Sequence, residues 1–267
     1  MSASTSDTTL LTDDELQSLA VELDGARKAA TAIPQVSTHT TLTLPQAYDV
    51  QRRSVAHRIA AEQDRQVGVK MGFTSHAKMQ QMGLSEVIWG RLTAGMAVAA
   101  DGTINLAGYV HPRVEAEIAF ILKAPLAGVV TAAQAMACVE AVAPALEIID
   151  SRYRNFKFSL SDVIADNASS SGFVMGALHA PDVDIADLAM TLSINGTVAA
   201  TASSADILGH PVQSLMEASR LVGAAGETLP AGAIILAGGA TAAVPLTAGA
   251  SVVLEVATLG RTGFRVL

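Results

Sequence analysis

The sequence has little that would crosslink the chain or attract a polyanion. Its 267 residues include one cysteine, Cys138, so no disulfide can form within the chain, and its apolar helical setting favours a buried structural thiol. Lysine and arginine number 17 against 25 acidic residues, and the net charge of −8 comes without a basic cluster. We therefore expect no nucleic-acid partner.

Long apolar runs are also missing. No stretch reaches the roughly 18 strongly apolar residues that a membrane-spanning helix needs, and residues 1–9 lack the basic and apolar segments of a secretory signal. We expect a cytoplasmic protein with no membrane partner. Charged residues make up only 16% of the chain, which is little to cover a surface. This shortage predicts that apolar surface is hidden in a homo-oligomer.

The first part of the chain is predicted to be helical. Thr12 and Glu15 have the spacing of a capping box, and apolar residues then recur at helical spacing to about Ala30. Thr43 begins a second capping box and a second helix. We predict an N-terminal helical region over residues 1–66.

From residue 67 onward, short apolar runs alternate with glycine, proline and aspartate, which is typical of strands with a few helices. We predict that residues 67–267 form a β-rich catalytic domain. Its clearest hairpin turns at Asn195-Gly196, a pair that suits a type I′ turn. Helices are predicted over residues 75–82, 131–141 and 211–222, and strands over 69–73, 118–122, 234–237, 251–256 and 263–267.

The most informative motif is the pair Glu115 and Glu117, which precedes a continuous apolar run. On a strand, residues i and i+2 point to the same side, so both carboxylates would face one point. Burying them unpaired would cost several kcal/mol, and a divalent metal removes that penalty. Glu147, in another apolar run, is the natural third ligand. The alternative is solvated charge on an exposed strand, but the apolar neighbours favour a metal.

Two further positions are candidates for chemistry. Lys70 lies in an apolar strand next to Gly72, which would let a ligand approach closely. It is either an edge-strand lysine that reaches solvent or a cation for a substrate carboxylate or a proton. Ser169 lies in a polar segment that is either a solvated turn or a binding site for a substrate oxygen. We interpret His76 and His111 as surface or structural residues.

Four stretches together resemble the fumarylacetoacetate hydrolase superfamily, and within it the hydratase/decarboxylase branch of catechol meta-cleavage pathways. They occur in the order expected for that branch, so the resemblance covers nearly the whole chain. The stretches are residues 68–75, 111–120, 145–153 and 166–170.

The resemblance implies a mixed α/β fold with a rolled, barrel-like sheet and a 2-oxo acid substrate. It also implies Mg²⁺ or Mn²⁺ bound by the positions that match the three glutamates. Catalytic roles fall on Lys70, which would orient a carboxylate or assist proton transfer, and on Ser169, which would hydrogen-bond the substrate. The predicted substrate-binding residues are Gly72, Ser75, Asp166 and Thr241, with Ser75 placed at the distal carboxylate.

Within the branch, residues 70–83 and His111-Pro112 are similar to decarboxylases. Ile88 stands before Trp89-Gly90, where we expect an acidic residue in hydratases. We therefore expect metal-dependent decarboxylation of a 2-oxo dicarboxylate, 2-oxo-3-hexenedioate, in aromatic catabolism. Three alternatives stay open: hydration of 2-hydroxypenta-2,4-dienoate, acylpyruvate hydrolysis, and a non-catalytic subunit in complex with a paralogous hydratase.

Overall fold

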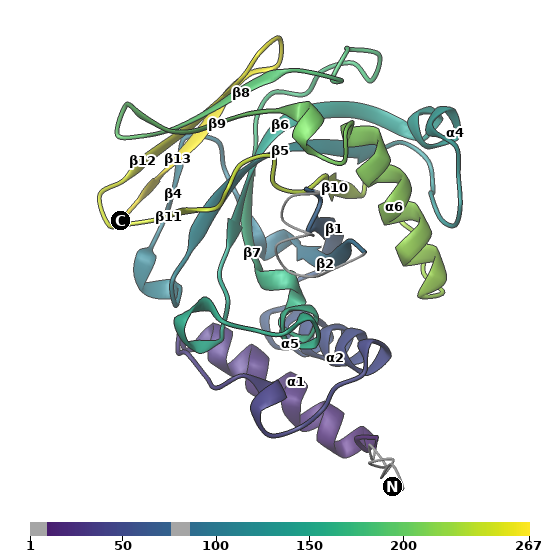
Figure 1. Ribbon diagram of the computed structural model, residues 1–267, viewed down its shortest axis with the longest axis vertical. Coiled ribbons are helices and arrows are strands. Elements are labelled where there is room, and N and C mark those ends of the chain that lie inside the picture. Colours follow the sequence, from purple (N-terminus) through teal and green to yellow (C-terminus); the bar gives the residue numbers. More distant parts are fainter. Residues whose placement is uncertain (1–9, 76–85) are drawn as a thin grey trace, which may run out of the picture.

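A curled mixed sheet forms the centre of the computed structural model, which describes residues 10–75 and 86–267 (Figure 1). In this described part the sheet has eight strands, seven of them in the order β2-β1-β10-β5-β6-β7-β3, with β11 paired to β5. The strands are β1 (Gln66–Gly72), β2 (Ile88–Thr93), β3 (Ala97–Val98), β5 (Arg113–Leu122), β6 (Val139–Ile149), β7 (Ser170–Met175), β10 (Ile234–Leu236) and β11 (Val244–Pro245).

The sheet is mixed because β1 and β10 are parallel, whereas β10, β5, β6 and β7 are successively antiparallel. Its curl in Figure 1 resembles half a barrel, so the expected mixed α/β fold with a rolled sheet is confirmed.

A second sheet has the order β4-β13-β12-β8-β9. It consists of β4 (Gly102–Ile104), β8 (Ala189–Ile194), β9 (Thr197–Ser203), β12 (Ser251–Val256) and β13 (Gly260–Val266). Strands β8 and β9 form the predicted hairpin, and its turn residues Asn195 and Gly196 both have positive φ, 52° and 77°. Positive φ at both positions is what a type I′ turn requires.

Helices α1 (Asp13–Lys28) and α2 (Leu44–Glu62) begin at the predicted capping boxes of Thr12 and Thr43. The other α-helices of the described chain are α4 (Ala132–Ala137), α5 (Leu160–Ala165) and α6 (Pro211–Ala224). Short 3₁₀ helices span Val36–Thr38, Ala94–Met96, Leu106–Gly108, Arg154–Phe156, Asn167–Ser169 and Ser204–Asp206.

The helix predicted over residues 131–141 is too long. Helix α4 ends at Ala137, because Val139 already pairs with Leu122 on β5 as the first residue of β6. Cys138 closes the helix and is only half-buried, so the predicted buried thiol is also wrong. The helix predicted over 75–82 and His76 lie outside the described residues, apart from Ser75.

The N-terminal helices pack against the segment that follows β6 (Figure 1). Helices α1, α2 and α5 share one apolar core, to which Tyr153 and Ala168 also belong. The Gln51 side chain on α2 donates to the carbonyls of Trp89 on β2 and Ile164 on α5, at 3.0 Å each. The helices therefore support the large sheet directly, and a domain boundary between residues 66 and 67 stays a prediction.

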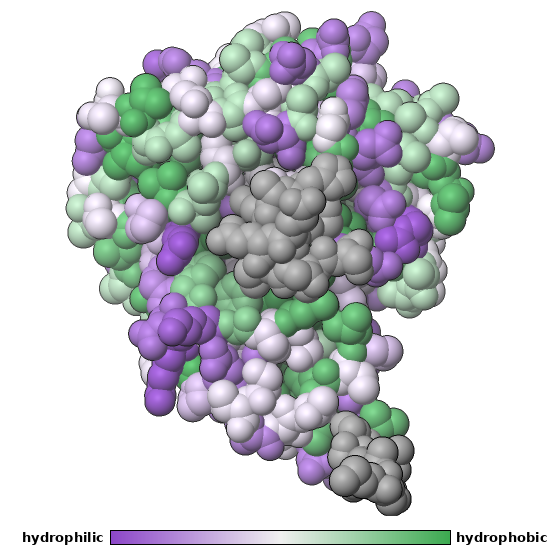
Figure 2. All heavy atoms as spheres, viewed as in Figure 1, coloured by the Kyte–Doolittle hydropathy of each residue, from purple (hydrophilic) through white to green (hydrophobic). Residues whose placement is uncertain are grey.

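The surface mixes polar and apolar side chains. Figure 2 shows hydrophobic residues over much of the face that is viewed in Figure 1, with hydrophilic residues gathered in several clusters. Exposed large apolar side chains include Val129, Leu178 and Val198. Within residues 10–75 and 86–267, no helix combines the length and the apolar character that crossing a bilayer requires.

Candidate metal centre and cavity

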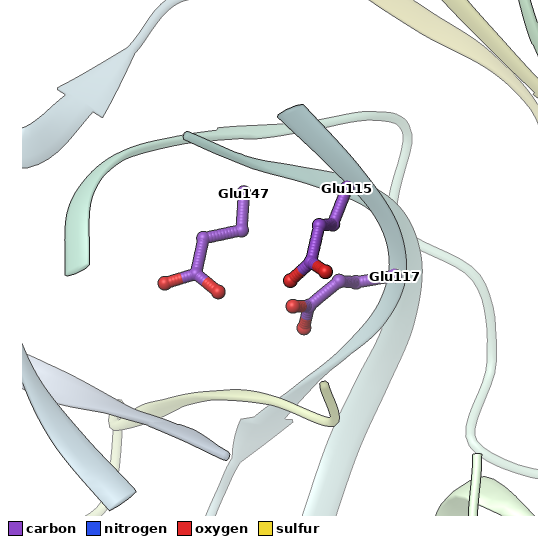
Figure 3. A group of neighbouring side chains, drawn as sticks. All are labelled: Glu115, Glu117 and Glu147. Atoms are coloured by element: carbon purple, nitrogen blue, oxygen red, sulfur yellow. The ribbon is translucent and has the colours of Figure 1, made fainter. Parts of the chain in front are cut away.

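Three glutamates converge on one face of the large sheet. Glu115 and Glu117 alternate along β5, and Glu115 lies opposite Glu147 on β6. One carboxylate oxygen from each residue lies within 4.8 Å of the others. Figure 3 shows the carboxylates of Glu115 and Glu117 side by side and that of Glu147 facing them. The structure thus brings together the three residues predicted to bind a metal.

Two of these carboxylates have too few hydrogen-bond donors for their burial. The side chains of Glu117 and Glu147 are 0% exposed, whereas Glu115 is half-buried. The Gly238 backbone N–H donates to Glu117 Oε2 at 2.7 Å. Among the described residues, no donor in hydrogen-bonding geometry reaches Glu117 Oε1 or either oxygen of Glu147. Buried oxygens without donors are costly, and a bound cation would satisfy them.

Lys70 supplies one positive charge to the cluster. Its Nζ lies 2.9 Å from Glu147 Oε2, an ion pair without good hydrogen-bond geometry, and donates to the Ala168 carbonyl at 3.1 Å. Lys70 is 3% exposed, and β1 pairs with β2 on one side and β10 on the other. The alternative of an edge-strand lysine reaching solvent is therefore wrong.

The charges of the cluster are unbalanced. Burial raises the pKa of Glu117 well above its usual value, and the charge of Glu147 raises it further. Burial also raises the pKa of Glu147, although Lys70 opposes this. Burial lowers the pKa of Lys70, but the carboxylates outweigh it and the net shift is upward, so the amine stays charged. Among the described residues, three ionised carboxylates against one ammonium would leave two excess negative charges.

This donor set fits a hard divalent cation. All three side chains offer oxygen, which Mg²⁺ and Mn²⁺ prefer over nitrogen and sulfur. Two positive charges would also balance the cluster. The expected Mg²⁺ or Mn²⁺ is consistent with the geometry, the orphaned oxygens and the charge.

A cavity of about 340 Å³ opens beside the glutamates. Of the predicted site residues, Glu115, Lys70, Ser169 and Gly72 line it, and its wall is otherwise largely apolar. The apolar wall includes Phe73, Ile88, Ile149, Phe156, Phe158, Val163, Ala168, Ala242 and Ala243. The sequence prediction missed Arg113, which also lines the cavity and lies two residues before Glu115, on the same face of β5.

The turn at Gly238 and Gly239 lies against the carboxylates. A Cβ atom at Gly239 would meet the Glu115 carboxyl carbon at 2.7 Å, so any larger residue there would displace the Glu115 carboxylate. Thr241, in the same turn, is buried and accepts a hydrogen bond from the Ala116 N–H at 3.2 Å. It does not line the cavity, and this hydrogen bond ties the turn to β5.

Ser169 is positioned by an unusual stretch of backbone. Asn167, Ala168 and Ser169 all have positive φ, 52°, 50° and 58°. This conformation costs roughly 1–2 kcal/mol for each residue that is not glycine. It aims the Ala168 carbonyl at Lys70, and it leaves the buried Ser169 hydroxyl at the cavity without a partner among the described residues. The solvated-turn alternative is wrong, because all three residues are buried.

Asp166 and Ser75 do not line the cavity. The Asp166 carboxylate accepts hydrogen bonds from the backbone N–H of Arg152 at 2.9 Å and from its Nε. Burial raises the pKa of Asp166 to about 6, and the Arg152 charge opposes this shift. Asp166 therefore holds the loop rather than facing a ligand. Ser75 is half-buried and follows Thr74, which does line the cavity.

A sequence profile of the fumarylacetoacetate (FAA) hydrolase C-terminal family matches residues 65–267. The chain belongs to this family. A 4-oxalocrotonate decarboxylase from Pseudomonas sp. is 54% identical over 250 residues, which cover 94% of this chain and 97% of that protein. A 2-hydroxyhexa-2,4-dienoate hydratase from Comamonas testosteroni is 35% identical, covering 85% of this chain and 87% of the relative.

A solved structure of the fumarylacetoacetate hydrolase fold is also very similar. The 4-oxalocrotonate decarboxylase from Pseudomonas putida G7, complexed with magnesium and adipate, superposes with a TM-score of 0.92 at 37% identity. The match covers 96% of this chain and 99% of that one. The family resemblance and the fold predicted from the sequence are therefore confirmed.

Proposed function

We propose that the protein is a metal-dependent 4-oxalocrotonate decarboxylase, which converts 2-oxo-3-hexenedioate to 2-hydroxypenta-2,4-dienoate and CO₂ in aromatic meta-cleavage catabolism. The observation that carries the proposal is the cluster of three glutamates and Lys70 beside a largely apolar cavity. The near full-length identity of 54% to a 4-oxalocrotonate decarboxylase supports the choice of reaction.

The reaction needs no organic cofactor, because the distal carboxylate is a vinylogous β-keto acid. The C5–C6 bond breaks and its electron pair forms the C4=C5 bond. The C3=C4 pair moves to C2–C3, and the 2-oxo oxygen receives the negative charge and then a proton. A divalent metal bound by Glu115, Glu117 and Glu147 would supply Lewis-acid stabilisation of that charge.

The protein's own groups then have separable roles. Lys70, held charged by the carboxylates, would orient the 2-oxo acid end or donate the proton to the oxygen. The Ser169 hydroxyl has no partner among the described residues and would donate to a substrate oxygen. Gly72 lines the cavity and, having no side chain, would let the substrate approach β1. The apolar wall would exclude water and so limit hydration of the product.

The hydratase remains the second candidate, and Ile88 argues against it. Ile88 lies in the wall of the cavity, where it offers no acid or base for adding water. Hydratases are nevertheless among the relatives, at 35% identity for the one from Comamonas testosteroni. We also propose a homo-oligomer, and a complex with a paralogous hydratase that consumes the dienoate. Size-exclusion chromatography with light scattering would test both assemblies.

The deciding experiment gives the purified protein and Mg²⁺ either 2-oxo-3-hexenedioate or 2-hydroxypenta-2,4-dienoate. Ultraviolet absorbance follows each substrate, and CO₂ is measured directly. We expect CO₂ release from the dicarboxylate that stops with a chelator and returns with Mg²⁺. Consumption of the dienoate alone would identify a hydratase, and no reaction with either compound would refute the decarboxylase.

A further inference from the structure

Arg113 continues the row of charged residues on β5. Positions 113, 115 and 117 lie on one face of this strand, and exposure increases from the buried Glu117 to the half-buried Glu115 and Arg113. Two residues of strand span roughly 7 Å, so Arg113 begins about that far from Glu115 along the cavity. Glu115 and Arg113 both line the same cavity of about 340 Å³.

The two cations of the cavity differ in what they contact. Lys70 faces Glu147 and the Ala168 carbonyl at the buried end. Within residues 10–75 and 86–267, Arg113 forms no ion pair, and its guanidinium lies over the aromatic ring of Phe156. A guanidinium in a cavity wall without a carboxylate partner is a binding group for an anion.

Phe156 fixes the direction of Arg113. The guanidinium carbon lies 4.3 Å from the centroid of the Phe156 ring. Phe156 has a positive φ of 55° and packs against His111 and Phe158, with ring centroids 5.2 Å and 5.6 Å away. Stacking occupies one flat side of the guanidinium and leaves its N–H edge available for bidentate binding of a carboxylate.

We infer that Arg113 binds the distal carboxylate of a short 2-oxo dicarboxylate whose 2-oxo acid end lies at the three glutamates. The inference rests on the proposed function and assigns this end of the substrate to Arg113 instead of Ser75. Arg113 is then the residue that selects dicarboxylates over monocarboxylates.

The reaction gives this contact a kinetic signature. The distal carboxylate loses its negative charge as CO₂ leaves, so Arg113 binds it more strongly in the bound substrate than in the transition state. Removing the guanidinium raises KM and does not lower kcat in proportion. A residue with a purely structural role would instead lower kcat or stability.

Isothermal titration calorimetry on the Mg²⁺-loaded protein separates the two ends of the ligand. The probes are 2-oxohexanedioate and 2-oxohexanoate, which share the 2-oxo acid end and differ in the distal carboxylate. Arg113→Met is expected to weaken the binding of 2-oxohexanedioate roughly 10- to 100-fold, which is the range of a charge-assisted hydrogen-bonded pair. The affinity for 2-oxohexanoate should not change. Arg113→Lys, which keeps the charge, is expected to lose less affinity for 2-oxohexanedioate than Arg113→Met.

Arg265→Met, which removes an exposed arginine from β13, is the matched control. It should not change the affinity for either probe. The inference would be overturned if Arg113→Met weakened the binding of both probes equally, or if it left the preference for the dicarboxylate unchanged. If Arg113→Met does not fold, the Lys variant decides by the same ratio of affinities. Absence of CO₂ release from the wild-type protein would refute the proposed function but would leave this ratio measurable.

Discussion

The two parts of the site that meet at Lys70 are built in opposite ways. Glu115, Glu117 and Glu147 lie on regular, paired strands, where alternation alone fixes which way they point. The segment Asn167–Ser169 has left-handed backbone at each of its residues and is fixed by contacts from distant parts of the chain. The positions of the predicted metal ligands are therefore encoded locally, whereas the position of the Ala168 carbonyl, which accepts from Lys70, depends on the whole fold.

Contacts from two sides hold the Asn167–Ser169 segment. The Arg152 guanidinium binds the carboxylate and carbonyl of Asp166 and the carbonyl of Asp150. From the other side, the Asn167 side chain accepts from the Arg91 N–H at 2.7 Å and donates to the Arg91 carbonyl at 2.9 Å. Gly90 permits this approach, since a Cβ atom there would lie 2.5 Å from the Asn167 carbonyl oxygen.

The largest effect is expected from a substitution among the three glutamates on the paired strands. Glu147→Gln keeps the shape of the side chain but removes a buried charge, so Mg²⁺-dependent CO₂ release should fall at least about 100-fold. The metal-free variant should be no less stable than the wild-type protein, because repulsion among the carboxylates decreases. Enzyme assays, Mg²⁺ titration calorimetry and thermal unfolding measure these effects.

Glu140→Gln is the matched control, because Glu140 lies on the same strand but is exposed. It should change neither activity nor Mg²⁺ affinity. Retention of Mg²⁺-dependent turnover by the Glu147 variant would contradict its assignment as a metal ligand.

A smaller effect is expected when the loop loses its support. Arg152→Met leaves Asp166 buried without its partner and should lower the free energy of unfolding by roughly 3–5 kcal/mol at neutral pH. Activity should fall as well, because the Ala168 carbonyl would shift away from Lys70 and the Ser169 hydroxyl would lose its position at the cavity. Urea unfolding and enzyme assays test this, with the exposed Arg154→Met as the control.

The loss of stability should also depend on pH in a defined direction. In the wild-type protein the pKa of Asp166 is raised to about 6, so its contribution to stability is full at low pH and is lost as pH rises from about 4 to 6. Without Arg152 the pKa of Asp166 should rise further, so the variant should continue to lose stability as the pH rises above 6. The difference between variant and wild type should therefore grow above pH 6, by at most about 1.4 kcal/mol per pH unit. A difference that stays constant would contradict this account.

The same contrast explains what the sequence could predict. The glutamates, the capping boxes of Thr12 and Thr43, and the Asn195-Gly196 turn follow local rules of spacing, and the structure has them where those rules place them. Arg113 was missed although the same alternation puts it on the face of Glu115.

Other features depend on pairings between distant segments. Lys70 lies on a strand that is paired on both sides because β1 pairs with β2 and also with β10, more than 160 residues later in the chain. Helix α4 ends early because Val139 pairs with β5. Asp166 looked like a ligand-binding residue because its partner Arg152 is not apparent from spacing. No local pattern carries such information.

The smallest expected effect tests the backbone strain itself. Ala168→Gly relieves the left-handed conformation but loses a buried methyl group, whereas Ala165→Gly on α5 loses a buried methyl group and helix propensity. The Ala168 variant should therefore be less destabilised than the Ala165 variant, by about 1 kcal/mol or more. Equal destabilisation in urea would mean that the fold holds this segment without appreciable strain. The contrast with the regular strands would then lie in the contacts alone.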